Sequence, residues 1–113
     1  MHEVGIARDV IDIVERTAKD SGLRAVSSVV LEIGKLSGVE PEALRFAFEL
    51  IRQGTVLEHA QISIEEPPLL LYCTQCDREY SAEVYDPLCP VCGGASYEVR
   101  QGMDMLVKSI SGE

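Results

Sequence analysis

Two cysteine pairs constrain the fold of this chain more than any other feature, because they contain all four of its cysteines. The pairs are Cys73-Thr74-Gln75-Cys76 and Cys89-Pro90-Val91-Cys92, with twelve residues between them. A gap of two residues lets both sulfurs of a pair bind one metal ion, and two such pairs complete a tetrahedral zinc site. We therefore expect a structural Zn(II) ion bound by Cys73, Cys76, Cys89 and Cys92.

Two other interpretations of the cysteine pairs stand beside the zinc site. A Cys-x-x-Cys motif also occurs in thioredoxin-like redox proteins, and paired cysteines can form a disulfide framework. The redox motif normally occurs once, on a strand-to-helix turn, so two facing copies favour a metal site. Because four sulfurs leave zinc no open coordination position, an enzyme that uses this zinc as a Lewis acid is disfavoured.

The charge of the chain restricts its partners. Among 113 residues, 19 are acidic and 10 are basic, which gives a net charge of −9. Such a chain repels phosphate backbones and anionic lipid, so nucleic acid and membrane surfaces are not expected as partners. The first residues lack the basic segment of a secretory signal, and no apolar run approaches the roughly 18 residues of a membrane span. We expect a soluble protein in the reducing cytoplasm, where paired cysteines are more often metal ligands.

The first 66 residues show helical and strand periodicity in alternation. Apolar residues recur at helical spacing over 6–19 and again from Pro41 to Ile51, and they alternate with polar residues over 26–33 and 60–65. The expected buried positions of the two helices are Ala7, Val10, Ile11, Val14, Ala18, Leu44, Ala47, Phe48 and Ile51. This pattern predicts a small α/β domain.

The remainder of the chain has the outline of a zinc ribbon followed by one more strand. Pro67-Pro68 marks a domain boundary, and short strands are expected at 79–84 and 96–100 around the cysteine pairs. The segment 105–110 is also strand-like but too short to stand alone, so we expect it to pair with the earlier strands. The zinc module, residues 67–102, would then be inserted in a domain formed by residues 1–66 and 103–113.

The start of the chain, Met1-His2-Glu3, offers a second and different metal site. A free terminal amine, the backbone nitrogen of His2 and its imidazole can bind one ion in fused chelate rings, a donor set that suits Ni²⁺ or Cu²⁺. At the start of a helix these backbone N–H groups have no intrahelical partner, so a metal can displace their protons without breaking the helix. Protons compete for the same nitrogens, so binding should weaken as the pH falls. The alternative is that His2, like His59, is a solvated residue without a metal.

Several motifs occur together in one order along the chain. They are Met1-His2-Glu3, Val30-Leu31-Glu32-Ile33-Gly34, Phe46-Ala47-Phe48-Glu49, Gly54-Thr55, the two cysteine pairs, and Leu106-Val107-Lys108-Ser109-Ile110. In this order they resemble the HypA/HybF family of nickel metallochaperones, which assist maturation of [NiFe]-hydrogenase and, in some organisms, urease. The resemblance covers the whole chain.

This resemblance implies an α+β fold with two helices packed on a three-stranded sheet and an inserted zinc ribbon. It implies a protein that carries Ni(II) and is not an enzyme, with Met1, His2 and Glu3 as nickel ligands and the four cysteines as zinc ligands. The implied partners are a HypB-type GTPase and the [NiFe]-hydrogenase large subunit. Some members have a histidine directly after a cysteine pair, where this chain has Asp77 and Gly93, so a role in pH sensing or urease service is not expected.

A different class of function stays open at this point. Paired Cys-x-x-Cys motifs are common in zinc ribbons that bind proteins or nucleic acid without carrying nickel. A nucleic-acid ribbon would show a basic face near the cysteines, yet only Arg78 and Arg100 stand there, among Asp77, Glu79, Glu83, Asp86 and Glu98.

Overall fold

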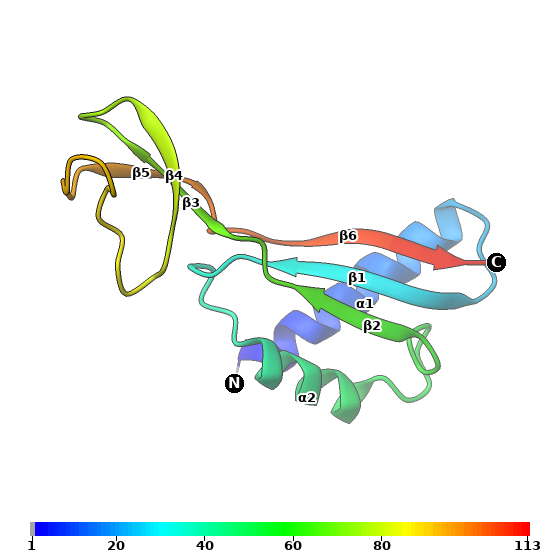
Figure 1. Cartoon of the computed structure of the whole chain (residues 1–113). Helices are drawn as coiled ribbons and strands as arrows, with labels where there is room; N and C mark the ends of the chain where they lie inside the picture. Colours follow the sequence, from blue (N-terminus) through cyan, green and yellow to red (C-terminus); the bar gives the residue numbers. More distant parts are fainter. Residues whose placement is uncertain (1) are drawn as a thin grey trace.

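The computed structural model describes residues 2–113, which form two helices and six strands (Figure 1). In chain order these are α1 (His2–Asp20), β1 (Val26–Ile33), α2 (Pro41–Ile51), β2 (Gln61–Glu65), β3 (Leu69–Cys73), β4 (Arg78–Ala82), β5 (Tyr97–Gln101) and β6 (Met105–Gly112). The helices and strands expected from periodicity are confirmed to within a few residues at each end.

The first sheet contains strands from both ends of the chain, in the order β2-β1-β6. Strands β1 and β2 are parallel and are connected through α2, whereas β6 runs antiparallel to β1 and pairs Ile110 with Val29. A register shift between Val30 and Leu31 interrupts the β1–β6 ladder. The expectation that the last strand returns to the earlier ones is therefore confirmed.

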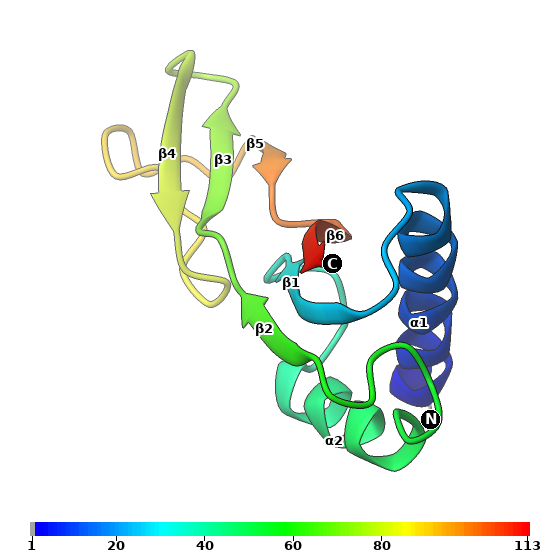
Figure 2. The same ribbon diagram turned by 90° about the vertical axis from the view of Figure 1, so that its right-hand side faces the viewer.

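Both helices pack on one face of this sheet and enclose the main core. Val29, Leu31 and Ile33 point inward from β1 and are almost fully buried. Figure 2 shows α1 and α2 on the same side of the sheet. The other members of this core are Ala7, Val10, Ile11, Val14, Ala18, Val26, Leu44, Ala47, Phe48, Leu57 and Ala60. Each large apolar side chain buried here contributes roughly 1.5–3 kcal/mol. We call α1, α2, β1, β2 and β6 the α/β half.

The second sheet has the order β4-β3-β5 and lies at the other end of an elongated molecule that measures 53 × 29 × 17 Å. Both of its ladders are antiparallel. Its core is small and consists of Leu69, Leu71, Cys73, Tyr80 and Cys89. We call residues 67–102, which contain this sheet, the cysteine half (Figure 1). Its expected independence as a domain stays a prediction.

The two halves meet at a close backbone contact. The N–H of Gly34 donates to the carbonyl of Asp104 at 2.8 Å, and that of Leu36 donates to Gly102 at 2.8 Å. A Cβ at Gly34 would lie 2.2 Å from the Gly102 oxygen, so only glycine fits at this crossing. Gly102 itself has φ 140°, a conformation that other residues rarely adopt. The Leu36 side chain then packs against the core of the cysteine half.

Within residues 2–113, neither helix combines the length and the apolar character that a membrane span requires. The fold class expected above, two helices on a three-stranded sheet with an inserted cysteine-rich module, is confirmed.

Candidate metal centres

The first cysteine pair lies where β3 ends and turns back into β4. Asp77 has φ 54°, and its N–H donates to the carbonyl of Cys73 at 2.9 Å, which closes the turn. The N–H of Cys76 points at the sulfur of Cys73, at 3.4 Å. The turn therefore holds the Cys73 sulfur and the backbone of Cys76 close together.

The second pair forms a similar turn in the loop between β4 and β5. Gly93, at φ 70°, donates its N–H to the carbonyl of Cys89 at 2.8 Å, and the N–H of Cys89 donates to Gly94 at 3.1 Å. The N–H of Gly94 also points at the Cys92 sulfur, at 3.4 Å. A Cβ at Gly94 would lie 3.2 Å from that sulfur, so the glycine keeps the backbone close to the ligand atom.

The two turns bring all four sulfurs together. Every pair of sulfurs lies within 4.8 Å, and the Sγ atoms of Cys73 and Cys92 are 3.7 Å apart. With Zn–S distances of about 2.3 Å, a tetrahedral site separates its sulfurs by roughly 3.8 Å. The cluster therefore fits one zinc ion. Cys73 and Cys89 are buried, Cys76 is half-buried, and Cys92 faces solvent.

The electrostatics of the cluster also indicate a cation. A hydrogen bond from the backbone N–H of Cys92 lowers the pKa of the Cys89 thiol to about 7, although burial acts in the opposite direction. The Cys92 thiol and burial raise the pKa of Cys76 to about 12. The thiolate form is therefore favoured at Cys89 and opposed at Cys76, and a bound dication would favour the thiolate at both positions.

The expected nickel residues lie in the other half, at the start of α1. Met1 is outside the described residues, so its place in a site stays a prediction. His2 is the first residue of α1, and its side chain is 64% exposed, with Nδ1 3.3 Å from Oε2 of Glu3. The N–H groups of His2 and Glu3 belong to the first turn of the helix, where no intrahelical acceptor is available. A terminal chelate could therefore form here without disturbing α1.

The Glu3 side chain is buried and does not point into solvent as the His2 side chain does. It is only 8% exposed, and its Oε2 accepts a long hydrogen bond of 3.4 Å from the N–H of Glu40. Glu40 is in turn the N-cap of α2, since its carboxylate accepts from the N–H of Glu42 at 2.9 Å. Glu3 thus anchors the first turn of α1 to the start of α2.

The contact between Glu3 and Glu40 was not predictable from the sequence. The segment Glu40-Pro41-Glu42 has the composition of a helix start, with proline in the first turn, and so the cap itself could be found. Nothing in the spacing indicates that a residue 37 positions earlier lies against it. The other histidine, His59, has a side chain that is 91% exposed and pairs with Glu58, which fits its interpretation as a solvated residue.

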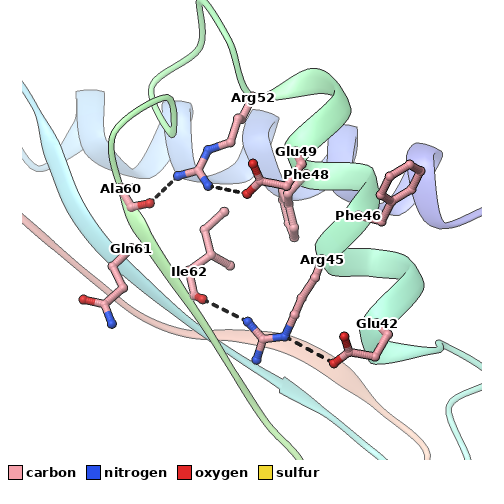
Figure 3. Close-up of a pocket in the computed structure, with 9 residues that line it drawn as sticks. All are labelled: Glu42, Arg45, Phe46, Phe48, Glu49, Arg52, Ala60, Gln61 and Ile62. Atoms are coloured by element: carbon pink, nitrogen blue, oxygen red, sulfur yellow. Dashed lines mark hydrogen bonds and ion pairs between the residues drawn. The ribbon is translucent and has the colours of Figure 1, made fainter.

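A groove lies between α2 and β2 in the α/β half (Figure 3). Arg45 and Arg52 extend from α2 and donate to the carbonyls of Ile62 and Ala60, at the strand that forms the edge of the sheet. Each arginine also pairs with a glutamate of the same helix. Because these guanidinium groups are already engaged, they protect a sheet edge and do not form a free anion site.

Comparisons with known proteins agree with this geometry. Residues 1–112 match the family described as "Hydrogenase/urease nickel incorporation, metallochaperone, hypA". The hydrogenase maturation factor HypA of Geotalea daltonii is 44% identical over 112 residues, 98% of each chain. The hydrogenase maturation factor HypA of Streptomyces avermitilis is also 44% identical, and the alignment covers 100% of this chain and 88% of that protein. The solution structure of the nickel metallochaperone HypA from Helicobacter pylori aligns with a TM-score of 0.70 at 25% identity, over 99% of this chain and 97% of that one.

Proposed function

This chain belongs to the HypA family of metallochaperones for nickel incorporation, and we propose that it carries Ni(II) on its first three residues and delivers it for maturation of [NiFe]-hydrogenase. In this proposal the nickel ligands are the Met1 amine, the backbone nitrogens of His2 and Glu3, and the His2 imidazole. The observation that carries it is the position of His2: an exposed imidazole on the first residue of a helix whose neighbouring side chain is anchored.

The anchoring of Glu3 would leave the ligand atoms free while fixing the backbone that bears them. The Glu3 carboxylate points inward to the start of α2, so the backbone nitrogen of Glu3 and not its carboxylate is the expected ligand. The atom Nδ1 of His2 closes the smaller chelate ring with the His2 backbone nitrogen, and this same atom faces Glu3 at 3.3 Å. Nickel binding would therefore exchange the contact with Glu3 for a metal bond, and protonation of the imidazole would favour release.

The second part of the proposal concerns zinc. We assign Zn(II) to Cys73, Cys76, Cys89 and Cys92, because their sulfurs have the separation of a tetrahedral site. Bound zinc would supply folding free energy to the cysteine half, and a closed four-sulfur site would keep it from exchanging with the nickel cargo. Such a site has no position for a substrate, in agreement with a delivery protein that is not an enzyme.

The partners follow from the family role in hydrogenase maturation. We propose that a HypB-type GTPase and the hydrogenase large subunit bind this protein in the cytoplasm, and that urease service is secondary. The alternative of a zinc ribbon without nickel cargo is not favoured, because the family match covers both halves of the chain and the surface around the cysteines is acidic.

Titration of the untagged protein with Ni²⁺ tests the proposal. A variant with two extra residues before Met1 and the variant His2→Ala should both lose the high-affinity site, while one equivalent of zinc and the thermal unfolding curve stay unchanged. His59→Ala is the matched control, since it removes the other histidine and should leave nickel affinity unaltered. Unchanged nickel affinity in the extended protein and in His2→Ala would refute the terminal site.

A further inference from the structure

Three of the exposed apolar side chains of the cysteine half lie in one short segment. Between β4 and the second cysteine pair, Val84 is 49% exposed, Tyr85 is 85% exposed and Leu88 is 48% exposed. In Figure 1 this segment is the yellow loop below β4, on the side of the molecule where the N-terminus lies. Single exposed apolar residues are ordinary, whereas exposed apolar residues that gather in one place are typical of interaction sites.

The segment is held in place from both sides. The N–H of Asp86 donates to the carbonyl of Glu83 at 3.0 Å, which closes a tight turn with Val84 and Tyr85 at its tip. The hydroxyl of Tyr80, a side chain in the core of the cysteine half, donates to the carbonyl of Pro87. Cys89 then joins the segment to the sulfur cluster. A surface that is already ordered loses little conformational entropy when a partner binds.

The residues at the tip are not those that a turn requires. The central positions of tight turns favour Gly, Pro, Asn, Asp and Ser, whereas Val and Tyr favour strands. Polar residues could form the same turn without exposing apolar side chains to water. Tyrosine is enriched among the residues that dominate binding energy in protein interfaces, because it supplies a large apolar area with few rotatable bonds. The composition of the tip therefore points to contact with a protein.

Two carboxylates flank this tip. Glu83 and Asp86 stand at its base, and no lysine or arginine occurs between Arg78 and Arg100. The chain as a whole carries a net charge of −9, and four thiolates around one zinc ion would add two more negative charges. Such a surface repels nucleic acid and anionic lipid, and it repels a second copy of itself. It complements a protein surface whose rim is basic.

We propose that Val84, Tyr85 and Leu88 form a docking surface that enters an apolar pocket, rimmed by lysine or arginine side chains, on a protein of the hydrogenase maturation machinery. Only the choice of the hydrogenase maturation machinery as the source of the partner rests on the proposed function. The surface itself rests on the exposure, the anchoring and the charge of residues 83–88. It places partner recognition in the cysteine half, whereas the proposed nickel ligands belong to the α/β half.

The test measures binding of the full-length, zinc-loaded protein to two purified probes, the HypB-type GTPase and the hydrogenase large subunit of the same organism. Tyr85→Ser should raise the Kd for one of them by on the order of tenfold or more. Glu83→Gln combined with Asp86→Asn should slow association at low salt and have little effect at high salt. Phe46→Ser is the control, since Phe46 is an equally apolar aromatic residue, 61% exposed, on α2 of the other half (Figure 3).

Zinc content, thermal unfolding and nickel affinity are measured on the same variants. All three should match the unaltered protein, so that a lost docking surface is distinguished from a lost fold and from failure of the nickel proposal. The inference is overturned if neither probe binds the unaltered protein, if Tyr85→Ser leaves both Kd values unchanged, or if Phe46→Ser weakens binding as much. Two further results would also overturn it. If the unaltered protein forms dimers that the substitution Tyr85→Ser dissociates, the surface binds a second copy of the chain. If the unaltered protein binds phosphatidylserine vesicles through this surface, its partner is lipid.

Discussion

The two halves of this molecule reach a folded state by different means. The α/β half has a core of fourteen buried residues that are all apolar and that come from two helices, a sheet and the connection between α2 and β2. The core of the cysteine half has five buried residues, and two of these are the cysteines Cys73 and Cys89. A three-stranded sheet with so small a core is marginal without a further constraint. The half proposed to carry the cargo metal therefore has a core large enough to fold without a metal, whereas the cysteine half is proposed to depend on a permanently bound zinc ion.

Removal of zinc should give the largest effect and should be confined to one half. Zinc binding supplies about 10–16 kcal/mol in comparable small sites, most of it as folding free energy. We expect Cys73→Ser, or treatment with a strong chelator, to abolish amide hydrogen-exchange protection in β3, β4 and β5. Protection in α1 and β1 should persist.

The control for this experiment is Pro90→Ala, which changes the second cysteine turn without removing a ligand. It should retain zinc and the protection of β3. If Cys73→Ser instead removed protection from both halves equally, the two would form one cooperative unit and the comparison would fail.

Truncation of the main core should give the converse result. Phe48 is 1% exposed and lies between α2 and the sheet, so Phe48→Ala should lower the free energy of unfolding of the α/β half by about 3–5 kcal/mol. Phe46→Ala, on the same helix but 61% exposed, should change it by less than about 0.5 kcal/mol. Urea unfolding followed by helix circular dichroism measures both values, and the zinc content should stay at one per chain in each variant. Loss of zinc from Phe48→Ala would show that the cysteine half depends on the core of its neighbour.

Much of this division was predictable from the sequence, because its main signals are local. Helical and alternating periodicity indicated the helices and strands of the α/β half, and Val29, Leu31 and Ile33 are buried on one face of β1, as the alternation over 26–33 predicts. The spacing of the cysteines gave the four-sulfur cluster. These signals depend on residues close together in the chain, or on one metal whose ligand chemistry is specific.

The contacts that join distant segments were not predictable in the same way. Burial of Glu3 against Glu40, and the packing of Leu36 against the cysteine half, each depend on how separate elements cross in space. In the sequence Gly34 is only the last residue of the motif Val30-Leu31-Glu32-Ile33-Gly34, whereas in the structure the backbone at Gly102 requires its lack of a side chain. Local propensity carries no information about which remote backbone will approach a residue.

A methyl group at Gly34 tests whether this crossing couples the halves. In Gly34→Ala the new Cβ would lie 2.2 Å from the Gly102 oxygen and 2.9 Å from the Asp104 oxygen, and both are backbone atoms that cannot rotate away. We expect a loss of about 1–3 kcal/mol, the usual cost of overpacking, together with faster hydrogen exchange at Gly102–Met105. Gly5→Ala is the matched control, because a Cβ there meets nothing within 4 Å and helix propensity should raise stability by about 0.5–1 kcal/mol. Equal stability changes in the two variants would mean that the crossing is not tight.

The smallest expected effect concerns Glu3. Its substitution separates two roles, the anchoring of the first turn of α1 and the proposed binding of nickel. Glu3→Gln keeps the shape of the side chain and the backbone nitrogen but removes the charge that faces His2 Nδ1 at 3.3 Å and Glu40 N–H at 3.4 Å. Because the second contact is long and a charge in the first helical turn is worth about 0.3–1 kcal/mol, we expect a stability loss near the lower end of that range. The nickel Kd should change by less than about threefold, a free-energy difference below about 0.7 kcal/mol, whereas His2→Ala should abolish the site. A loss of nickel affinity in Glu3→Gln as large as that in His2→Ala would make the carboxylate itself a ligand, and the α/β half would then have to release Glu3 from α2 to take up its cargo.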